Sequence, residues 1–250
     1  MIEFAARLLA GARCGLVFTG AGVSTESGIR DFRGPNGLWK QYDPYKTADI
    51  RHFMEDPARY WTIARERWST YKQAHPNAGH YALAAMEEAG HVASVVTQNT
   101  DGLHAAAGSR RVIELHGNGR EVVCLDCGGR EPRADVQARL DSEMPPRCRS
   151  CAGGFIKPAV VFFGEALPRR ALIEAYGRAG ETDLVLVVGS SLQVYPAADI
   201  PLAGKRAGAP LVIVNEEPTP FDELADVVIR GKSGAVLPSL LEKAQELAGA

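Results

Sequence analysis

The chain reads Thr19-Gly-Ala-Gly-Val-Ser-Thr-Glu-Ser-Gly-Ile-Arg-Asp-Phe-Arg33 directly after the short apolar run Leu16–Phe18. The apolar run predicts a buried strand. The two glycines one residue apart predict a loop whose backbone can approach a bulky anion, so we expect a diphosphate-binding loop after the first strand. The spacing departs from the dinucleotide-binding pattern G-x-G-x-x-G, because Thr25 stands where that pattern has its third glycine.

Apolar runs of strand length recur along the chain and alternate with helical patterns. We expect buried strands at residues 15–19, 92–97, 183–188, 210–214 and 226–229. We expect helices at residues 2–12, 79–89, 169–178, 197–206 and 235–247. This alternation is typical of an α/β fold, a Rossmann-like parallel sheet with helices on both faces.

Two segments interrupt the alternation and predict a smaller second part of a single domain that spans residues 1–250. The segment at about 35–75 is aromatic and helical, and the segment at about 121–154 carries four cysteines. The larger, Rossmann-like part then consists of residues about 1–34, 76–120 and 155–250.

Composition excludes several classes of function. Apolar residues make up 46% of the 250 residues and the formal net charge is −2, which is typical of a globular protein and does not indicate a nucleic-acid or membrane surface. No apolar run approaches the roughly 18 residues that a membrane helix needs. The first residues lack the pattern of a signal peptide, so we expect a cytoplasmic protein.

Four of the five cysteines form two pairs, Cys124-x2-Cys127 and Cys148-x2-Cys151. In a reducing compartment this spacing indicates zinc more often than disulfides or redox chemistry. Each C-x-x-C turn places two thiolates on one metal, and two such turns complete a closed tetrahedral site. We therefore expect one structural zinc ion bound by Cys124, Cys127, Cys148 and Cys151.

Small or polar residues follow the carboxyl ends of the expected strands. Gln98–Asp101 follow the strand at 92–97, and Gly189–Ser191 follow the strand at 183–188. Asn215 and Glu216 follow the next strand, and Ser233 lies shortly after the last one. Polar loops are common in any protein, but parallel sheets bind ligands beyond these strand ends, so a shared cofactor cleft is the better interpretation.

Three features suggest chemistry in that cleft, each with a structural alternative. His116 lies beside Gly117 after a short apolar run, and it is either a general base or a structural histidine. Asn99 and Asp101 either both face the cleft, or one of them forms an Asx-turn or helix cap for the segment 102–107. The run Lys157–Glu165 is either a core or edge strand, or an exposed edge that pairs with a peptide.

Seven motifs, in this order, resemble those of the sirtuin family, and the likeness extends from Gly20 to about Ser233. They are Gly20–Ser24, Gly28–Arg33, Thr97–Asp101, Leu115–Asn118, the four cysteines, Phe162–Glu165 and Gly189–Leu192. The chain is similar to bacterial and archaeal sirtuins, which implies an NAD-dependent protein-lysine deacetylase.

The resemblance implies that NAD is a consumed substrate. The acetyl oxygen of a modified lysine attacks the nicotinamide ribose and nicotinamide leaves. His116 as base then helps a ribose hydroxyl attack the acyl carbon, and water completes the transfer. The products are free lysine, nicotinamide and acetylated ADP-ribose. Such chemistry needs dry walls, fixed dipoles and one base.

The resemblance also implies a role for each matching residue. Phe32 shields the ribose from water, and Asp101 accepts from the nicotinamide carboxamide. Catalytic roles fall on His116, Asn99 and Asp101. Cofactor-binding roles fall on Gly20, Ala21, Gly22, Ser24, Asp31, Phe32, Arg33, Gln98, Asn99, Asp101, Gly189, Ser190, Ser191, Asn215, Glu216 and Ser233. Substrate-binding roles fall on Val161, Phe163, Gly164, Glu165 and Val194.

The chain departs from the family pattern at two positions, with Arg30 in place of proline and Thr100 in place of an aliphatic residue. Neither removes a catalytic group. Sirtuins that prefer succinyl-lysine carry Tyr-x-x-Arg in the helical insertion, whereas here neither Tyr60 nor Trp61 has arginine three residues later. We therefore expect neutral acyl groups, acetyl first.

Other functions stay open at this level. Protein mono-ADP-ribosylation shares the cofactor and the leaving group, and longer acyl chains are a further alternative. A dehydrogenase is disfavoured by Thr25, and a nucleic-acid-binding zinc ribbon by the neutral charge balance between Cys124 and Cys151. We expect an acetylated protein or peptide as partner, no membrane or nucleic acid, and a monomer.

Overall fold

The structure is a computed structural model that describes residues 1–151 and 153–249. Its centre is a six-stranded sheet in the order β3-β2-β1-β7-β8-β9, in which every neighbouring pair is parallel. This is the Rossmann strand order, so the predicted α/β fold is confirmed. The strands are β1 (Gly15–Thr19), β2 (Val92–Thr97), β3 (Val112–Glu114), β7 (Val185–Val188), β8 (Leu211–Val214) and β9 (Val227–Ile229).

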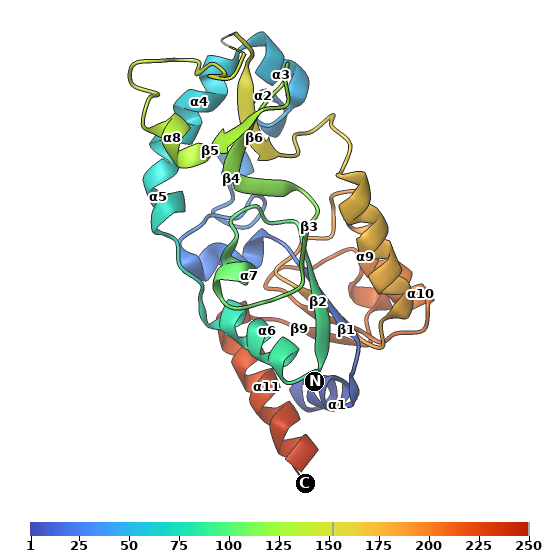
Figure 1. Cartoon of the computed structure of the whole chain (residues 1–250). Coiled ribbons are helices and arrows are strands. Elements are labelled where there is room, and N and C mark those ends of the chain that lie inside the picture. Colours follow the sequence, from blue (N-terminus) through green and yellow to red (C-terminus); the bar gives the residue numbers. More distant parts are fainter. Residues whose placement is uncertain (152, 250) are drawn as a thin grey trace.

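Alternate strand residues face opposite layers, so the sheet builds two cores. Val17, Leu186 and Val212 pack with the helices α1 (Ile2–Gly11), α6 (Ala78–Glu88) and α11 (Ser233–Gly249). Their neighbours Phe18 and Val187 face the helices α9 (Arg169–Glu181) and α10 (Asp199–Arg206). Figure 1 shows these two helical layers on opposite sides of the strands.

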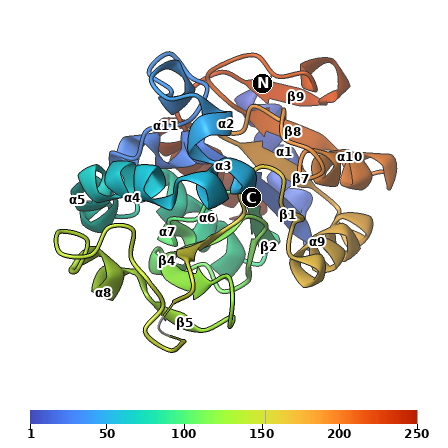
Figure 2. The same ribbon diagram turned by 90° about the horizontal axis from the view of Figure 1, so that it is seen from above.

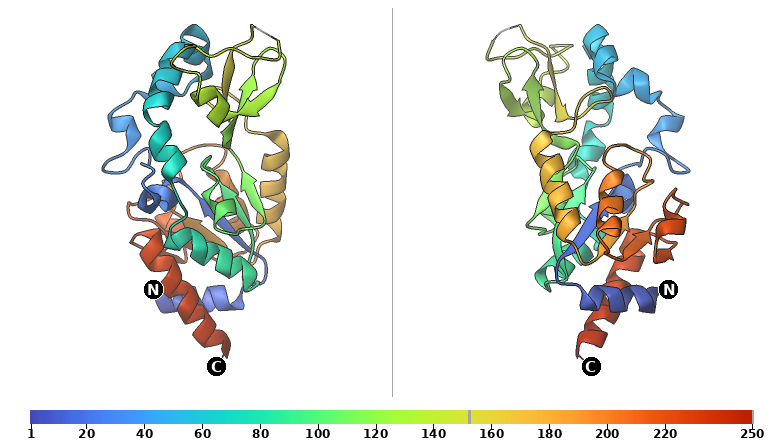
Figure 3. Two further views of the ribbon diagram at one scale, coloured as in Figure 1. Left: turned by 60° about the vertical axis from the view of Figure 1, so that its left-hand side comes forward. Right: turned by 90° about the vertical axis from the view of Figure 1, so that its right-hand side faces the viewer.

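A second cluster of elements lies beyond the carboxyl end of the sheet, above it in Figure 1. It contains a three-stranded antiparallel sheet in the order β5-β4-β6 and a third core around Trp61, Val122 and Ile156. The indole N–H of Trp61 donates to the carbonyl of Ile156 at 3.1 Å and so joins its helices to its strands. Figures 2 and 3 show this arrangement from above and from two sides. The elements are α2 (Pro44–Thr47), α3 (Ile50–Glu55), α4 (Pro57–Glu66), α5 (Trp68–Gln73), β4 (Gly117–Cys124), β5 (Arg130–Pro132), α8 (Arg133–Gln137) and β6 (Ile156–Val160).

Side-chain caps begin several of these helices. Asp49 accepts from the backbone of Arg51 at the start of α3, and Asp56 precedes Pro57 at the start of α4. Asn77 and His80 form a capping box at the start of α6. These residues supply acceptors for amides that have no partner inside the helix.

Three elements differ from the sequence-based expectations. Val112–Glu114 add a sixth strand, because they pair with β2 at the edge of the sheet. The run expected to be extended as far as Glu165 leaves its strand at Val160, since Phe163 bonds instead to the backbone of Ala48 and Ile50. The glycine-rich loop contains 3-10 turns, η1 (Ala21–Ser27). The division into two parts at the stated boundaries stays a prediction.

Among the described residues, no helix combines the length and apolar character that crossing a bilayer requires.

Candidate active site

A cavity of about 1280 Å³ opens where the strand order reverses, between the loops that follow β1 and β7. A crevice at this point is the usual ligand site of such sheets. The structure brings every predicted catalytic, cofactor and substrate residue to the wall of this one cavity. Its lining includes Gly20, Ala21, Gly22, Ser24, Asp31, Phe32, Arg33, Gln98, Asn99, Asp101, His116, Val161, Phe163, Gly164, Glu165, Gly189, Ser190, Ser191, Val194, Asn215, Glu216 and Ser233.

The two glycines of the first loop are required by the chain itself. A Cβ on Gly20 or Gly22 would lie 2.8 Å from the backbone of Gly189. The amide of Gly20 donates to Val188 and the amide of Gly22 donates to Gly189. From the sequence, we expected these glycines to allow the close approach of an anion. The structure shows that they allow the close approach of the loop after β7.

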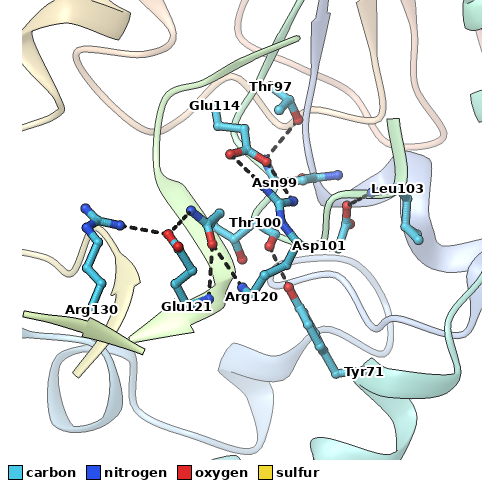
Figure 4. Close-up of polar contacts among 11 residues, drawn as sticks. Tyr71, Thr97, Asn99, Thr100, Asp101, Leu103, Glu114, Arg120, Glu121 and Arg130 are labelled. Carbon is cyan, nitrogen blue, oxygen red and sulfur yellow. Dashed lines mark hydrogen bonds and ion pairs between the residues drawn. The ribbon is translucent and has the colours of Figure 1, made fainter. Parts of the chain in front are cut away.

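A hydrogen-bonded network joins this loop to the segment after β2. Ser24 Oγ donates to Asp101 Oδ2 at 2.7 Å and accepts from Asn99 Nδ2 at 3.2 Å. Asn99 Nδ2 also lies 3.1 Å from the carbonyl of Gly20, and its backbone amide donates to Thr97 Oγ1 at 3.0 Å. Figure 4 shows Asn99 and Asp101 on either side of Thr100. The network presents a carboxamide and a carboxylate from one rigid loop.

Asp101 also forms an Asx-turn with the backbone that follows it. Its Oδ1 accepts from the amide of Leu103 at 2.9 Å, at the start of the short helix α7 (Leu103–Ala106). Gly102 between them has φ +77°. Of the local alternatives considered from the sequence, the Asx-turn therefore holds for Asp101, which also lies on the cavity wall.

The surroundings of His116 select one tautomer of its ring. Nδ1 lies 3.0 Å from the carbonyl of Gln98, which can only accept, so Nδ1 carries the proton and Nε2 keeps its lone pair. Burial lowers the pKa of His116, although the bond to Gln98 opposes this shift. The ring is therefore neutral at pH 7, with a basic nitrogen available.

A turn after β6 forms the side of the cavity beside His116. The amide of Val161 donates to the His116 carbonyl at 2.9 Å. Glu165 Oε2 accepts from the amide of Phe162 at 2.8 Å and lies 3.0 Å from Lys157 Nζ, which is 5% exposed. This ion pair between a buried lysine and a half-buried glutamate braces the turn that carries the predicted substrate residues.

Aromatic rings cover the mouth of the glycine-rich loop. Phe32 is 40% exposed and packs on Trp39 with ring centroids 4.8 Å apart, and Trp39 in turn faces Phe163 at 6.4 Å. Burial lowers the pKa of Arg33 beside them. A partly exposed apolar surface therefore lies next to a guanidinium on the cavity wall.

The far end of the cavity is formed by the loops after β7, β8 and β9. Gln98 Nε2 donates to Ser190 Oγ at 2.9 Å, and Asn215 Nδ2 donates to the Glu217 carbonyl at 2.7 Å. Ser233 is buried at the start of α11, where its neighbour Gly234 donates to Glu26 at 2.7 Å. Glu216 is exposed. These hydroxyl, amide and carboxylate groups suit a polar ligand.

Sequence reasoning assigned no site residue to the helical segment, yet the segment supplies much of one wall. Its lining side chains include Tyr42, Tyr60, Ile63, Arg67, Thr70 and Tyr71. The aromatic content of residues 35–75 was the one available signal, because the spacing of these residues does not show which of them face the cavity.

The four cysteines form a separate cluster away from the cavity. Their sulfur atoms all lie within 4.8 Å of one another, with 3.7 Å between Cys124 and Cys151 and 3.7 Å between Cys127 and Cys148. Four thiolates about 2.3 Å from one zinc ion would be about 3.8 Å apart. The donor set and its spacing therefore fit a tetrahedral structural zinc ion.

Comparisons with known proteins agree with this geometry. Residues 20–196 match the Sir2 family. The chain is 47% identical over 246 residues to the NAD-dependent protein deacylase 2 of Archaeoglobus fulgidus, which covers 98% of this chain and 97% of that protein. It is 49% identical over 233 residues to the NAD-dependent protein deacetylase of Sulfolobus acidocaldarius, with 93% and 90% covered.

The fold agrees as closely. A solved structure of a Sir2 variant with a deacetylated p53 peptide and 3′-O-acetyl ADP-ribose has a TM-score of 0.92 to this chain at 42% identity, with 97% of this chain and 98% of the other covered. A family match over most of the chain and nearly full-length relatives above 40% identity lead to one conclusion. The chain belongs to the Sir2 family.

Proposed function

We propose that the protein is an NAD-dependent protein-lysine deacetylase, which moves an acetyl group from a lysine side chain to ADP-ribose. One observation carries this proposal: a neutral histidine, the Asn99–Asp101 loop and the turn after β6 meet in the cavity at the switch point of the sheet. Relatives named for this activity and a related complex with its products support it.

NAD extends across the carboxyl edge of the sheet in this proposal. The diphosphate lies by Gly20–Gly22 and Arg33, and the adenosine lies by Asn215, Glu216 and Ser233. Ser190 and Ser191 hold phosphate or ribose hydroxyls. This places the nicotinamide end beside Asn99 and Asp101, where the carboxylate of Asp101 accepts from the carboxamide.

The peptide lies along the turn after β6. The carbonyl of Val161 and the ring of Phe163 contact the acyl-lysine, and Val194 contacts it from the opposite loop. Main-chain pairing of the peptide with the exposed backbone of Gly164 gives affinity without a demand on sequence, since the backbone of Phe163 already pairs with Ala48 and Ile50. The Lys157–Glu165 ion pair keeps this segment in shape before the peptide arrives.

The reaction follows from these placements. The acetyl oxygen bonds to C1′ of the ribose as the bond from C1′ to nicotinamide breaks, and neutral nicotinamide keeps the electron pair. A ribose hydroxyl then gives its proton to Nε2 of His116 and bonds to the acyl carbon. The lysine amine takes the proton back from His116 and leaves that carbon. Water then adds to the carbon, and the bond from the carbon to the oxygen on C1′ breaks, so the acetyl group stays on the ribose hydroxyl. Phe32 excludes water during the first step, and Asn99 and Asp101 supply fixed dipoles.

Zinc supplies folding free energy to the second cluster of elements when it is bound. Cys124, Cys127, Cys148 and Cys151 would hold it as a closed site, which leaves no position for a substrate.

We propose acetyl as the preferred acyl group. Arg67 lies on the cavity wall, but Ala64 stands three residues before it, so the tyrosine of a Tyr-x-x-Arg pair is missing. A neutral short acyl group leaves no carboxylate to be desolvated. A monomeric state and a cytoplasmic location stay predictions from the sequence.

The test uses one histone-like peptide with an acetyl, succinyl or long acyl group on the same lysine, with and without NAD. We expect NAD-dependent release of free lysine, with the highest kcat/KM for acetyl. A higher kcat/KM for succinyl would overturn the acyl preference. ADP-ribose on the protein without deacylated peptide would favour a mono-ADP-ribosyltransferase, and formation of NADH would favour a dehydrogenase.

A further inference from the structure

Tyr71 reaches from the helical segment to the loop that carries two of the proposed catalytic residues. It lies on α5, and its hydroxyl donates to the carbonyl of Thr100 at 2.5 Å. Figure 4 shows this contact beside Asn99 and Asp101. Tyr71 and Thr100 both line the cavity.

The Thr100 carbonyl has a second donor, the amide of Gly119 at 2.8 Å. A Cβ on Gly119 would collide with the Tyr71 hydroxyl and would lie 3.1 Å from that carbonyl. Glycine at position 119 therefore leaves the space in which the tyrosine bond forms. Two donors from different elements hold one carbonyl oxygen in place.

The position of this carbonyl matters because Thr100 links Asn99 to Asp101, so its backbone sets the orientation of both neighbours. Both of these side chains converge on Ser24 Oγ, at 3.2 Å and 2.7 Å. A rotation of the Thr100 peptide unit would turn them apart. The bond from Tyr71 opposes such a rotation from outside the sheet.

The ring of Tyr71 is itself fixed. It stacks on Trp68 with centroids 6.0 Å apart and planes 18° apart, and the guanidinium of Arg133 lies 5.6 Å from both rings. Arg133 is 8% exposed. Burial raises the pKa of Tyr71, and Asp101 adds to this effect, so the hydroxyl stays protonated and remains a donor.

We infer that Tyr71 is a positioning residue for the nicotinamide-facing loop: through the Thr100 carbonyl it sets the orientation of Asn99 and Asp101. Tyr71 belongs to the helical segment, and Arg133 belongs to the segment that carries the four cysteines. Both segments thereby control the orientation of Asn99 and Asp101, which follow strand β2 of the parallel sheet. The inference rests on the proposed function.

The test compares Tyr71→Phe with Tyr81→Phe, which removes a hydroxyl from an exposed tyrosine on α6. We expect kcat for the acetylated peptide to fall roughly three- to tenfold in Tyr71→Phe, as for the loss of one hydrogen bond. The KM for peptide stays unchanged, because Tyr71 does not contact the turn after β6. Inhibition by nicotinamide weakens, because Asp101 is displaced. The control keeps wild-type values.

A second variant tests the same bond without altering Tyr71. Gly119→Ala displaces the hydroxyl, so it should reproduce the fall in kcat and add little to it in the Tyr71→Phe background. A merely structural role would lower the melting temperature and leave kcat and nicotinamide inhibition, measured well below that temperature, unchanged.

The inference is overturned if both variants keep kcat and nicotinamide inhibition within twofold of an active wild type, or if their effects on kcat simply multiply. An inactive wild type, by contrast, would contradict the proposed function itself.

Discussion

Replacement of His116 by tyrosine separates the proposed base from the rest of the site. The substitution removes the Nε2 lone pair and the Nδ1 bond to Gln98, which is 3.0 Å long. It leaves the glycine-rich loop, Asn99, Asp101 and the turn after β6 in place. We expect a folded protein that binds NAD and cannot complete acyl transfer.

Two general magnitudes set the size of the expected effects. A positioned general base contributes about 10²- to 10⁴-fold in rate. This corresponds to roughly 2.7–5.4 kcal/mol at about 1.36 kcal/mol for each tenfold. The lost bond to Gln98 costs about 0.5–1.5 kcal/mol of stability. For a chain of this size that cost lowers the melting temperature by about 1–6 °C.

The assay measures release of deacetylated peptide by mass spectrometry, NAD binding by calorimetry, and the exchange of labelled nicotinamide into NAD. His75→Tyr is the control, because His75 is exposed and outside the cavity lining. We expect the exchange to survive in His116→Tyr better than deacetylation, since the base acts after nicotinamide has left. Turnover within tenfold of wild type would refute the assignment of His116, and so would an equal loss of exchange and deacetylation.

Three further perturbations test other parts of the site. The acid limb of kcat/KM should lie below pH 6.5, because burial lowers the pKa of His116 and the base must be unprotonated. Activity is then retained at pH 6.5 and is lost as the pH falls through the lowered pKa. An acid limb above pH 6.5 would contradict this assignment. Removal of zinc, verified by metal analysis, should lower the melting temperature and unfold the segment around the four cysteines. The metal contributes to folding, and Cys124 and Cys148 belong to the hydrophobic core of that segment. An unchanged melting curve with full activity would exclude a structural role. Gly189→Ala should destabilise the protein by about 1–3 kcal/mol and weaken NAD binding, because Gly189 has φ +59° and its Cβ would meet the backbone of Gly22 and Val23. The control is Gly177→Ala on α9, where a Cβ meets nothing within 4 Å. Equal melting temperatures for the two variants would count against the close approach of the loops.

The parallel sheet was predictable because its strands are short apolar runs that end in small or polar residues. Strands with this pattern are buried on both faces, and their carboxyl ends meet at one edge. This places Gly20, Asn99, Ser190 and Asn215 together although they are far apart in sequence. Local sequence patterns were sufficient to predict the sheet, since each strand has its own apolar run followed by small or polar residues.

The helical wall of the cavity was not predictable in the same way. Tyr71 on α5 bonds to Thr100, and Arg133 on α8 lies against the ring of Tyr71, although these three residues belong to segments far apart in the sequence. No spacing in the sequence records that packing. The run after Lys157 shows the same limit, because its strand ends where Phe163 finds partners in Ala48 and Ile50, more than a hundred residues earlier.

The role of the glycine-rich loop also changed with the structure. Gly20 and Gly22 were expected to admit a diphosphate, but their missing Cβ atoms first allow the loop after β7 to pack closely. The same glycines therefore build the switch point at which the ligand is proposed to lie. Composition alone could not separate these two uses of glycine.

The most direct test of the proposed function is the fate of oxygen when an acetyl-lysine peptide and NAD react in heavy-oxygen water. If the acetyl oxygen attacks the ribose, it stays on C1′, and the oxygen from water enters the acetyl group. The account predicts one nicotinamide and one acetylated ADP-ribose for each lysine freed, with the heavy oxygen in the acetyl group. Free acetate and intact NAD, or a label only on the ribose, would contradict it.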